Sequence, residues 1–119
     1  MGRGEIMRLT NKEMEIMVVL WGSEDALTAA EIIELSENRT WKDASIYIIM
    51  TTLLKKGAVI MPHHKPTATN TARAYKPLVT SEEYISRTVA ALMKKGVKVS
   101  IPILVEKLSD KKAMRKRSK

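Results

Sequence analysis

Residues 41–57, WKDASIYIIMTTLLKKG, decide how the rest of the chain is interpreted. Five apolar side chains recur at the spacing that puts them on one face of a helix, and they are Ile46, Ile49, Met50, Leu53 and Leu54. Gly57 is the predicted end of this helix. The opposite face is small, hydroxylated and partly apolar, and it lacks the mixture of Glu and Lys that an ordinary solvent-facing helix carries. The pattern therefore predicts a helix that is buried on one side and available to a partner on the other.

Two helices are predicted upstream from their N-terminal signals. Residues 10–13 (TNKE) and 28–31 (TAAE) both match the capping box, in which a hydroxyl and a carboxylate three residues apart satisfy free amides of the first turn. The first helix is expected to end at about Trp21 and the second at about Asn38. The three helices together predict a compact tri-helical unit.

The periodicity changes after this unit. Residues 58–61 (AVIM) and 72–76 (ARAYK) are short and β-prone, and residues 62–71 between them are polar and contain two prolines. A β-hairpin with a ten-residue loop is therefore predicted. Three helices followed by a hairpin are the order of a winged helix-turn-helix, whose third helix enters the DNA major groove. The predicted fold class is mostly α with a small β-hairpin.

Two amphipathic helices are predicted after the hairpin. One begins at about Ser81 and stops at Gly96, and the other begins near Ser100, with Pro102 in the first turn, where proline is tolerated. Because their apolar faces have no partner of similar size in the chain, we expect a second copy to cover them in a twofold dimer. The residues assigned to this interface are Tyr84, Ile85, Val89, Leu92, Leu104, Val105 and Leu108.

The net charge of +8 is unevenly distributed. Residues 1–60 carry seven Lys and Arg against nine Asp and Glu, whereas residues 81–119 carry eleven against four. The early acidic surplus weighs against DNA, because duplex binding depends on neutralising phosphates. The predicted organisation is a DNA-binding winged domain over residues 1–79, a helical dimerisation segment over residues 80–110 and a basic, disordered tail over residues 111–119.

Other classes of function find little support in the sequence. The absence of cysteine excludes disulfides, thiolate metal sites and cysteine nucleophiles. Adjacent His63 and His64 form a poor metal pair, because neighbouring residues of a strand point to opposite faces. No Gly-rich phosphate loop, HExxH or GxSxG motif is present, so we expect neither an enzyme nor a cofactor or metal site. Without a long apolar run or a signal peptide, the expected location is the cytoplasm, with no membrane partner.

The candidate site is a surface for double-stranded DNA. The residues expected to face bases are Lys42, Ala44, Ser45, Tyr47, Ile48 and Thr51, because such a face can approach base edges and thymine methyls. The candidates for phosphate contact are Arg8, Asn11, Lys55, Lys65 and Arg73. The alternative is that Tyr47 and Ile48 dock on a protein, which would make the chain a winged-helix interaction module without sequence-specific DNA binding.

Several spaced landmarks resemble one known family. They are Leu9-Thr10, Glu13, Met17 and Leu20-Trp21, then residues 27–32 (LTAAEI), then Trp41, Ser45-Ile46, Thr51, Leu53 and Lys56-Gly57, and finally residues 75–78 (YKPL). Across residues 9–108 this order is similar to the penicillinase-repressor family of bacterial regulators. The resemblance implies a homodimeric winged-helix repressor on a palindromic operator, with bases read from residues 42–51 and dimerisation through the C-terminal helices.

The chain lacks the residues through which members of this family respond to their inducing signals. Members that answer to β-lactams are cut at an Asn-Phe bond, and this chain has no Phe and carries residues 103–107 (ILVEK) at the matching place. The copper-responsive branch uses cysteines, which are also absent. The resemblance therefore identifies neither an inducing ligand nor a protease. Tyr47 and Ile48 replace residues that are more commonly polar or basic, which implies a different operator sequence.

Overall fold

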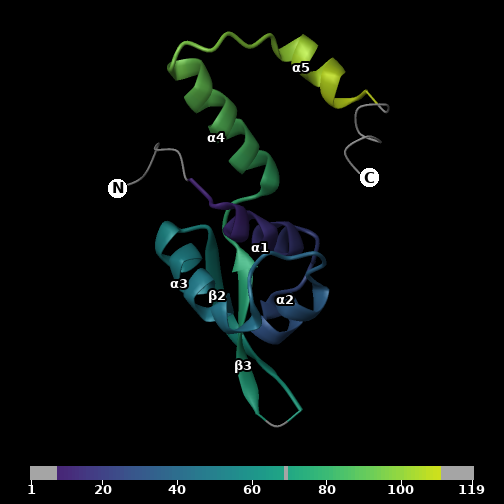
Figure 1. Cartoon of the computed structure of the whole chain (residues 1–119), viewed down its shortest axis with the longest axis vertical. Helices are drawn as coiled ribbons and strands as arrows, with labels where there is room; N and C mark the ends of the chain where they lie inside the picture. The colour runs from purple at the N-terminus through teal and green to yellow at the C-terminus, as the bar shows by residue number, and fades with distance from the viewer. Residues whose placement is uncertain (1–7, 69, 111–119) are drawn as a thin grey trace. The chain divides into compact units, whose positions relative to one another are not determined.

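The structure is a computed structural model of the chain, and it describes residues 8–68 and 70–110. It divides into two units, one ending at Thr88 and one beginning at Val89. The elements are α1 (Asn11–Trp21), β1 (Leu27–Thr28), α2 (Ala29–Leu35), the 3-10 turn η1 (Asp43–Ser45), α3 (Ile46–Lys56), β2 (Val59–Pro66), β3 (Thr71–Pro77), α4 (Ser81–Lys94) and α5 (Ile101–Leu108) (Figure 1). Within the described residues, no helix has the length and apolar character needed to cross a membrane.

The first unit has the predicted fold, three helices followed by a β-hairpin, and the fold class is confirmed. The hairpin belongs to an antiparallel sheet of three strands in the order β1-β3-β2. Strand β1 pairs Leu27 with Tyr75 and Thr28 with Ala74. The sequence analysis missed this strand, because two residues that run directly into a capping box show no alternating pattern.

Both predicted capping boxes are present. The Thr10 amide donates to Glu13 Oε1 at 2.9 Å, and the Thr28 amide donates to Glu31 Oε1 at 2.9 Å. In each box the amide of the glutamate donates back to the threonine hydroxyl at 3.2 Å. These local bonds fix where α1 and α2 begin. Helix α2 ends at Leu35, so the prediction that it reaches Asn38 is wrong.

Helix α3 is buried along the face that its periodicity predicted. Ile46, Met50 and Leu53 are at most 1% exposed and belong to one core cluster with residues of α1 and α2. The helix ends at Gly57, whose φ of 79° is left-handed, a conformation that suits glycine. The amides of Gly57 and Ala58 donate back to Leu54 O and Leu53 O at 3.1 and 3.0 Å. This closure turns the chain from α3 directly into β2.

The hairpin differs from its prediction. Strands β2 and β3 pair as far as Pro66 with Thr71, so only residues 67–70 connect them, and the predicted ten-residue loop is wrong. The two prolines misled the prediction because they lack an amide hydrogen. An edge strand such as β2 tolerates them, and the ladder is irregular between Ile60 and His63, next to Pro62. Strands β2 and β3 form the wing of the fold, which is therefore a long ribbon that extends beyond the three helices (Figure 1).

The start of helix α4 packs against the end of α1. The indole of Trp21 donates to Val79 O at 2.9 Å, and its ring lies 6.1 Å from the ring of Tyr84. The first unit therefore extends to Thr88, inside α4, whereas the sequence analysis places a domain boundary after residue 79. The assignment of a DNA-binding role to one part and a dimerising role to the other stays a prediction.

Candidate nucleic-acid interface

The outer face of α3 is open to solvent in the described chain. Tyr47 is 64% exposed and Ile48 is 72% exposed, although both are large and their helix is otherwise held in the core. Of the other four residues predicted to face bases, Lys42, Ala44 and Thr51 are exposed and Ser45 is half-buried. Tyr47, Ile48 and Thr51 lie on α3, whereas Lys42, Ala44 and Ser45 lie in and beside the 3-10 turn that leads into it. Their assignment to DNA bases stays a prediction.

Two hydroxyls on this helix already have their hydrogens engaged. Thr51 Oγ1 donates to Tyr47 O at 2.8 Å, and Thr52 Oγ1 donates to Ile48 O at 3.1 Å. The oxygens keep lone pairs that can accept a further bond, and in a major groove the amino groups of adenine and cytosine are the available donors. Thr52 was missed in the sequence analysis, although the Thr-Thr pair beside the exposed face was a usable signal.

Most of the predicted phosphate contacts lie on the surface. Arg8, Asn11, Lys55 and Arg73 are all exposed. Lys56, which follows Lys55 in the last turn of α3, donates to Arg8 O at 2.5 Å and to Glu13 Oε1 at 2.6 Å. This contact ties the backbone of Arg8 to a side chain from the last turn of α3.

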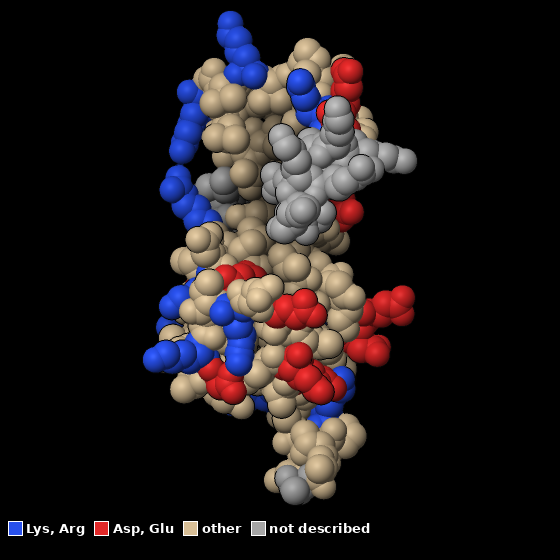
Figure 2. Space-filling model, turned by 45° about the vertical axis from the view of Figure 1, so that its right-hand side comes forward, with Lys and Arg blue, Asp and Glu red and all other residues tan. Residues whose placement is uncertain are grey.

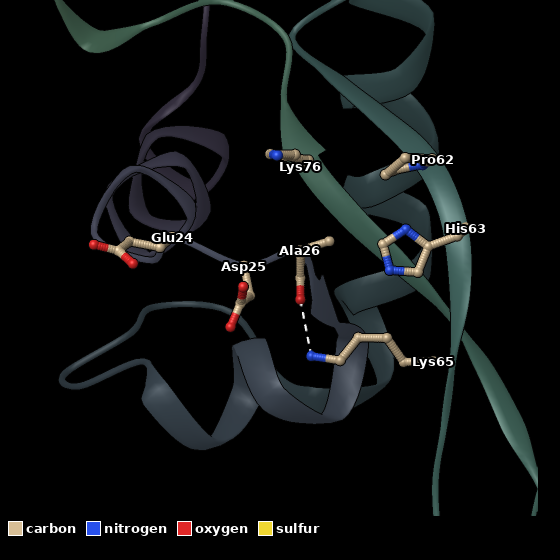
Figure 3. A pocket seen from close by; sticks show the side chains of 7 residues that line it. All are labelled: Glu24, Asp25, Ala26, Pro62, His63, Lys65 and Lys76. Atoms are coloured by element: carbon tan, nitrogen blue, oxygen red, sulfur yellow. Dashed lines mark hydrogen bonds between the residues drawn. The ribbon is translucent and has the colours of Figure 1, made fainter.

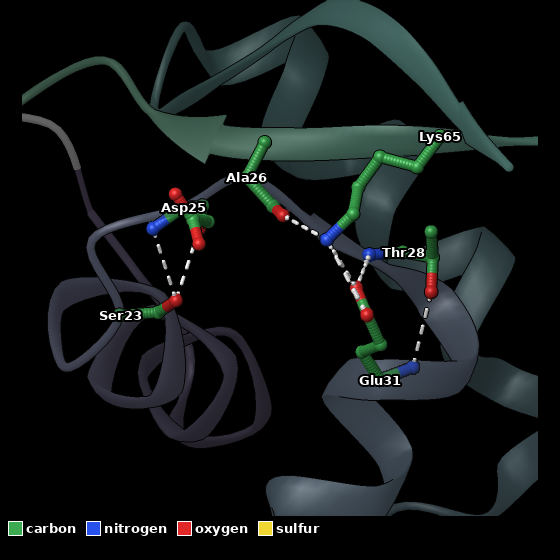
Figure 4. Close-up of polar contacts among 6 residues, drawn as sticks. All are labelled: Ser23, Asp25, Ala26, Thr28, Glu31 and Lys65. Carbon is green, nitrogen blue, oxygen red and sulfur yellow. Dashed lines mark hydrogen bonds and ion pairs between the residues drawn. The ribbon is translucent and has the colours of Figure 1, made fainter.

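Lys65 is the exception among the predicted phosphate contacts. Its ammonium donates to Ala26 O at 2.9 Å and to the two carboxylate oxygens of Glu31 at 3.0 and 3.3 Å (Figure 4). Lys65 is half-buried and engaged inside its own unit, whereas the other four candidates are exposed.

The same contacts act on the ionisation of Glu31. The hydrogen bond from the Thr28 amide, followed by that from the Lys65 ammonium, holds the pKa of the Glu31 carboxyl below its ordinary value of 4.5. The folded protein therefore binds fewer protons than the unfolded chain near that pH. The stabilisation is fully present above about pH 4.5 and is lost as the pH falls through the lowered pKa of the folded state.

Glu31→Gln should therefore lower the free energy of unfolding at neutral pH and lower it less in acid. The amide keeps an oxygen for the capping box but cannot ionise. Urea unfolding of both proteins at about pH 6 and about pH 3.5 measures the difference. A gap in midpoint that is the same at both pH values would contradict the ion pair.

A cluster that the sequence analysis missed holds the start of α3. The guanidinium of Arg39 lies 4.6 Å from the ring centroid of Trp41 and pairs with Asp43, four residues later. Trp41 itself is 3% exposed and is part of the core. Residues 36–42 are not helical, so the i,i+4 rule for helix surfaces could not have predicted this contact. The cluster fixes the turn that presents Lys42 and Ala44.

A shallow cavity of about 370 Å³ lies beside the wing. Residues 24–26 border it on one side, and Pro62, His63, Lys65 and Lys76 border it from the two strands (Figure 3). Its walls carry carboxylates on the loop side and basic groups on the strand side. Across the described residues, no group of three or more His, Cys, Asp and Glu side chains is placed to hold a metal ion.

The acidic surplus of the first sixty residues does not cover the whole surface. In Figure 2, Asp and Glu lie across the face of the three-helix unit that is in view, and most of the Lys and Arg side chains visible on it lie toward its left-hand side, with others among the acidic groups. The more basic side is therefore the part of this face that favours the approach of a polyanion.

Comparison with known proteins connects this fold to a family. A family model described as "Penicillinase repressor" matches residues 9–118, which confirms the resemblance found in the sequence. The penicillinase repressor of Bacillus licheniformis is 32% identical over 81 residues, a region that spans 68% of this chain and 59% of that protein. The match therefore covers less than two thirds of that relative.

Two solved structures are also similar. One is the solution structure of the Bacillus licheniformis BlaI monomeric form in complex with the blaP half-operator, with 25% identity, a TM-score of 0.48 and coverage of 81% of this chain and 96% of that chain. The other is the ferric uptake regulator Fur of Helicobacter pylori, with 17% identity, a TM-score of 0.45 and coverage of 78% and 73%. The match to the repressor family also confirms the prediction that the chain is not an enzyme.

Proposed function

Because the chain belongs to the penicillinase-repressor family, we propose that it is a sequence-specific DNA-binding repressor of transcription. The observation that carries the proposal is the exposure of Tyr47 and Ile48 on the third helix of a winged helix-turn-helix fold. Large apolar side chains in that place have no partner within the described unit. A repressor acts on the bacterial chromosome, so the proposal places the protein in the cytoplasm.

The proposed mechanism is occupation of a promoter, without covalent chemistry. Helix α3 enters the major groove, where Ile48 meets thymine methyls and Tyr47 and Thr51 meet polar base edges. Exposed cations at Arg8, Lys55 and Arg73 contact phosphates and set the register of the helix on the duplex.

Selection of bound duplexes from a random-sequence pool, followed by gel shift, tests this function. The proposal predicts an enriched motif that the protein binds more tightly than random duplex, by about 10³-fold or more. Salt-sensitive binding without sequence preference would leave only electrostatic attraction. That result, or no binding, would favour the alternative, in which Tyr47 and Ile48 dock on a protein.

We further propose a homodimer, which would make the operator palindromic. Of the residues predicted for the interface, Ile85, Leu92, Val105 and Leu108 are between 43% and 58% exposed in the single chain. Val89 and Leu104 are half-buried, and Tyr84 already lies against Trp21. Two copies related by a twofold axis would cover these apolar faces and present two copies of α3 to two half-sites.

Leu108→Glu should weaken this dimer. A carboxylate placed in an apolar interface costs several kcal/mol, so the dimer dissociation constant should rise by about 100-fold. Sedimentation equilibrium of the variant and the wild type measures the change, with Ser86→Glu, at an exposed polar position of α4, as the control. A variant that dimerises as tightly as the wild type would place the interface elsewhere.

A further inference from the structure

The ammonium of Lys65 is engaged inside the protein with a carbonyl and a carboxylate. It donates to Ala26 O at 2.9 Å and to the Glu31 carboxylate, whose two oxygens lie at 3.0 and 3.3 Å from Nζ and share one N–H donor. The positive charge is compensated by the Glu31 carboxylate at 3.0 Å. A phosphate that approached Lys65 would meet a positive charge that is already compensated, and the adjacent carboxylate would repel it. Phosphate contact, the role predicted from the sequence, is therefore a poor match to the geometry.

The acceptors of Lys65 are themselves fixed by other contacts. Glu31 Oε1 also accepts the Thr28 amide in the capping box of α2. Ala26 is 5% exposed and precedes β1, which is paired with β3. One end of the contact is therefore anchored to the helical core and to the sheet, and the other end is a side chain of the wing (Figure 4).

The wing strand itself has few other restraints beyond its pairing with β3. Val59, at the start of β2, is 2% exposed, whereas residues 60–64 are all exposed. The ladder with β3 is irregular between Ile60 and His63. The cavity of about 370 Å³ separates this part of the strand from the loop before β1, so side-chain packing does not fill that space (Figure 3). Lys65 crosses from the strand to Ala26 and Glu31 beyond the irregularity.

In each of the capping boxes of α1 and α2, the glutamate also accepts a lysine ammonium from a distant part of the chain. Glu13, the capping-box glutamate of α1, accepts the Lys56 ammonium at 2.6 Å, and Glu31, the capping-box glutamate of α2, accepts that of Lys65. In the first case the pair joins α1 to the end of the third helix, and in the second it joins α2 to the wing. Both pairs join helix N-termini to parts of the proposed DNA-binding surface.

We propose that Lys65 is a positioning residue, which clamps the wing to the N-terminus of α2 and so sets the orientation in which the wing meets DNA. This inference rests on the proposed function for its effect on binding, but the clamp itself does not. It assigns phosphate contact on the hairpin to Arg73, which is exposed on β3, and gives Lys65 a role that acts through the wing.

Three variants separate positioning from phosphate contact in gel shifts on the selected duplex over a range of salt concentrations. Lys65→Met and Glu31→Gln should each weaken binding by roughly fivefold, with the salt slope of the wild type, because each opens the clamp without removing a phosphate contact. Arg73→Met should lower the slope by about 0.9. Glu31→Gln provides the sharpest test, since a phosphate-binding Lys65 would be released by it and bind DNA at least as tightly.

Amide hydrogen exchange tests the clamp without DNA. Lys65→Met and Glu31→Gln should both speed exchange in β2 beyond Ile60, while the core amides of α1 and α3 keep their protection. Unchanged exchange in the wing would overturn the inference whether or not the protein binds DNA. A lower salt slope for Lys65→Met together with undiminished binding by Glu31→Gln would overturn it as well. Failure of the wild type to select any duplex, with wing exchange altered as expected, would instead refute the proposed function and retain the clamp.

Discussion

Tyr47→Ala is expected to weaken binding to the selected duplex by about 10- to 100-fold, equivalent to about 1–3 kcal/mol, and to leave binding to random duplex nearly unchanged. Tyr47 is 64% exposed, so truncation removes surface available to DNA and little that the fold needs. Its side chain carries no formal charge, so the phosphate-dependent part of the affinity is retained. The variant should therefore lose discrimination between sequences while keeping its non-specific affinity.

The matched control is Val18→Ala, which shortens another exposed apolar residue, on α1. It should bind the selected and random duplexes as the wild type does, and both variants should unfold at the wild-type temperature. If Tyr47→Ala keeps full discrimination, the exposed face does not read DNA. If Tyr47→Ala instead converts dimers to monomers, the face has been assigned to the wrong partner.

Leu53→Ala is expected to lower the free energy of unfolding by about 2–5 kcal/mol, more than any of the other substitutions proposed. Leu53 is fully buried in the cluster that joins α1, α2 and α3, so its truncation leaves a cavity in the middle of the unit. A domain of this size is stable by only about 5–15 kcal/mol, so the change is a large fraction of the total. Urea unfolding followed by circular dichroism measures it.

Leu35→Ala is the control for this substitution, because it removes the same atoms from a side chain that is 55% exposed. It should change the free energy of unfolding by no more than about 0.5 kcal/mol. Equal, small effects of the two substitutions would mean that the inner face of α3 is not packed as described. The orientation of Tyr47 and Ile48 would then no longer be fixed by the core.

The parts of the fold that follow from local signals could be predicted. The alternation of faces on α3 depends on residues three and four apart, and a capping box depends on residues three apart, so each is visible in a short window. The exposed outer face and the buried Met50 and Leu53 follow from the first signal. The start of α1 at Asn11 follows from the second.

The parts that depend on distant residues could not be predicted. Lys65 lies 34 positions from Glu31, and Lys56 lies 43 positions from Glu13, so no periodicity connects the partners of either ion pair. For this reason Lys65 was interpreted as a free cation. The length of the hairpin was missed because Pro62 and Pro66 favour a loop unless the strand is known to be at the edge of a sheet.

Photo-crosslinking from position 48 tests the central claim most directly. An Ile48→p-benzoylphenylalanine protein, irradiated on the selected duplex, should crosslink to DNA, and the same replacement at Val18 should give no DNA adduct. Crosslinks from position 48 to protein, with none to a duplex that is bound, would show that the outer face of α3 does not lie on the bases.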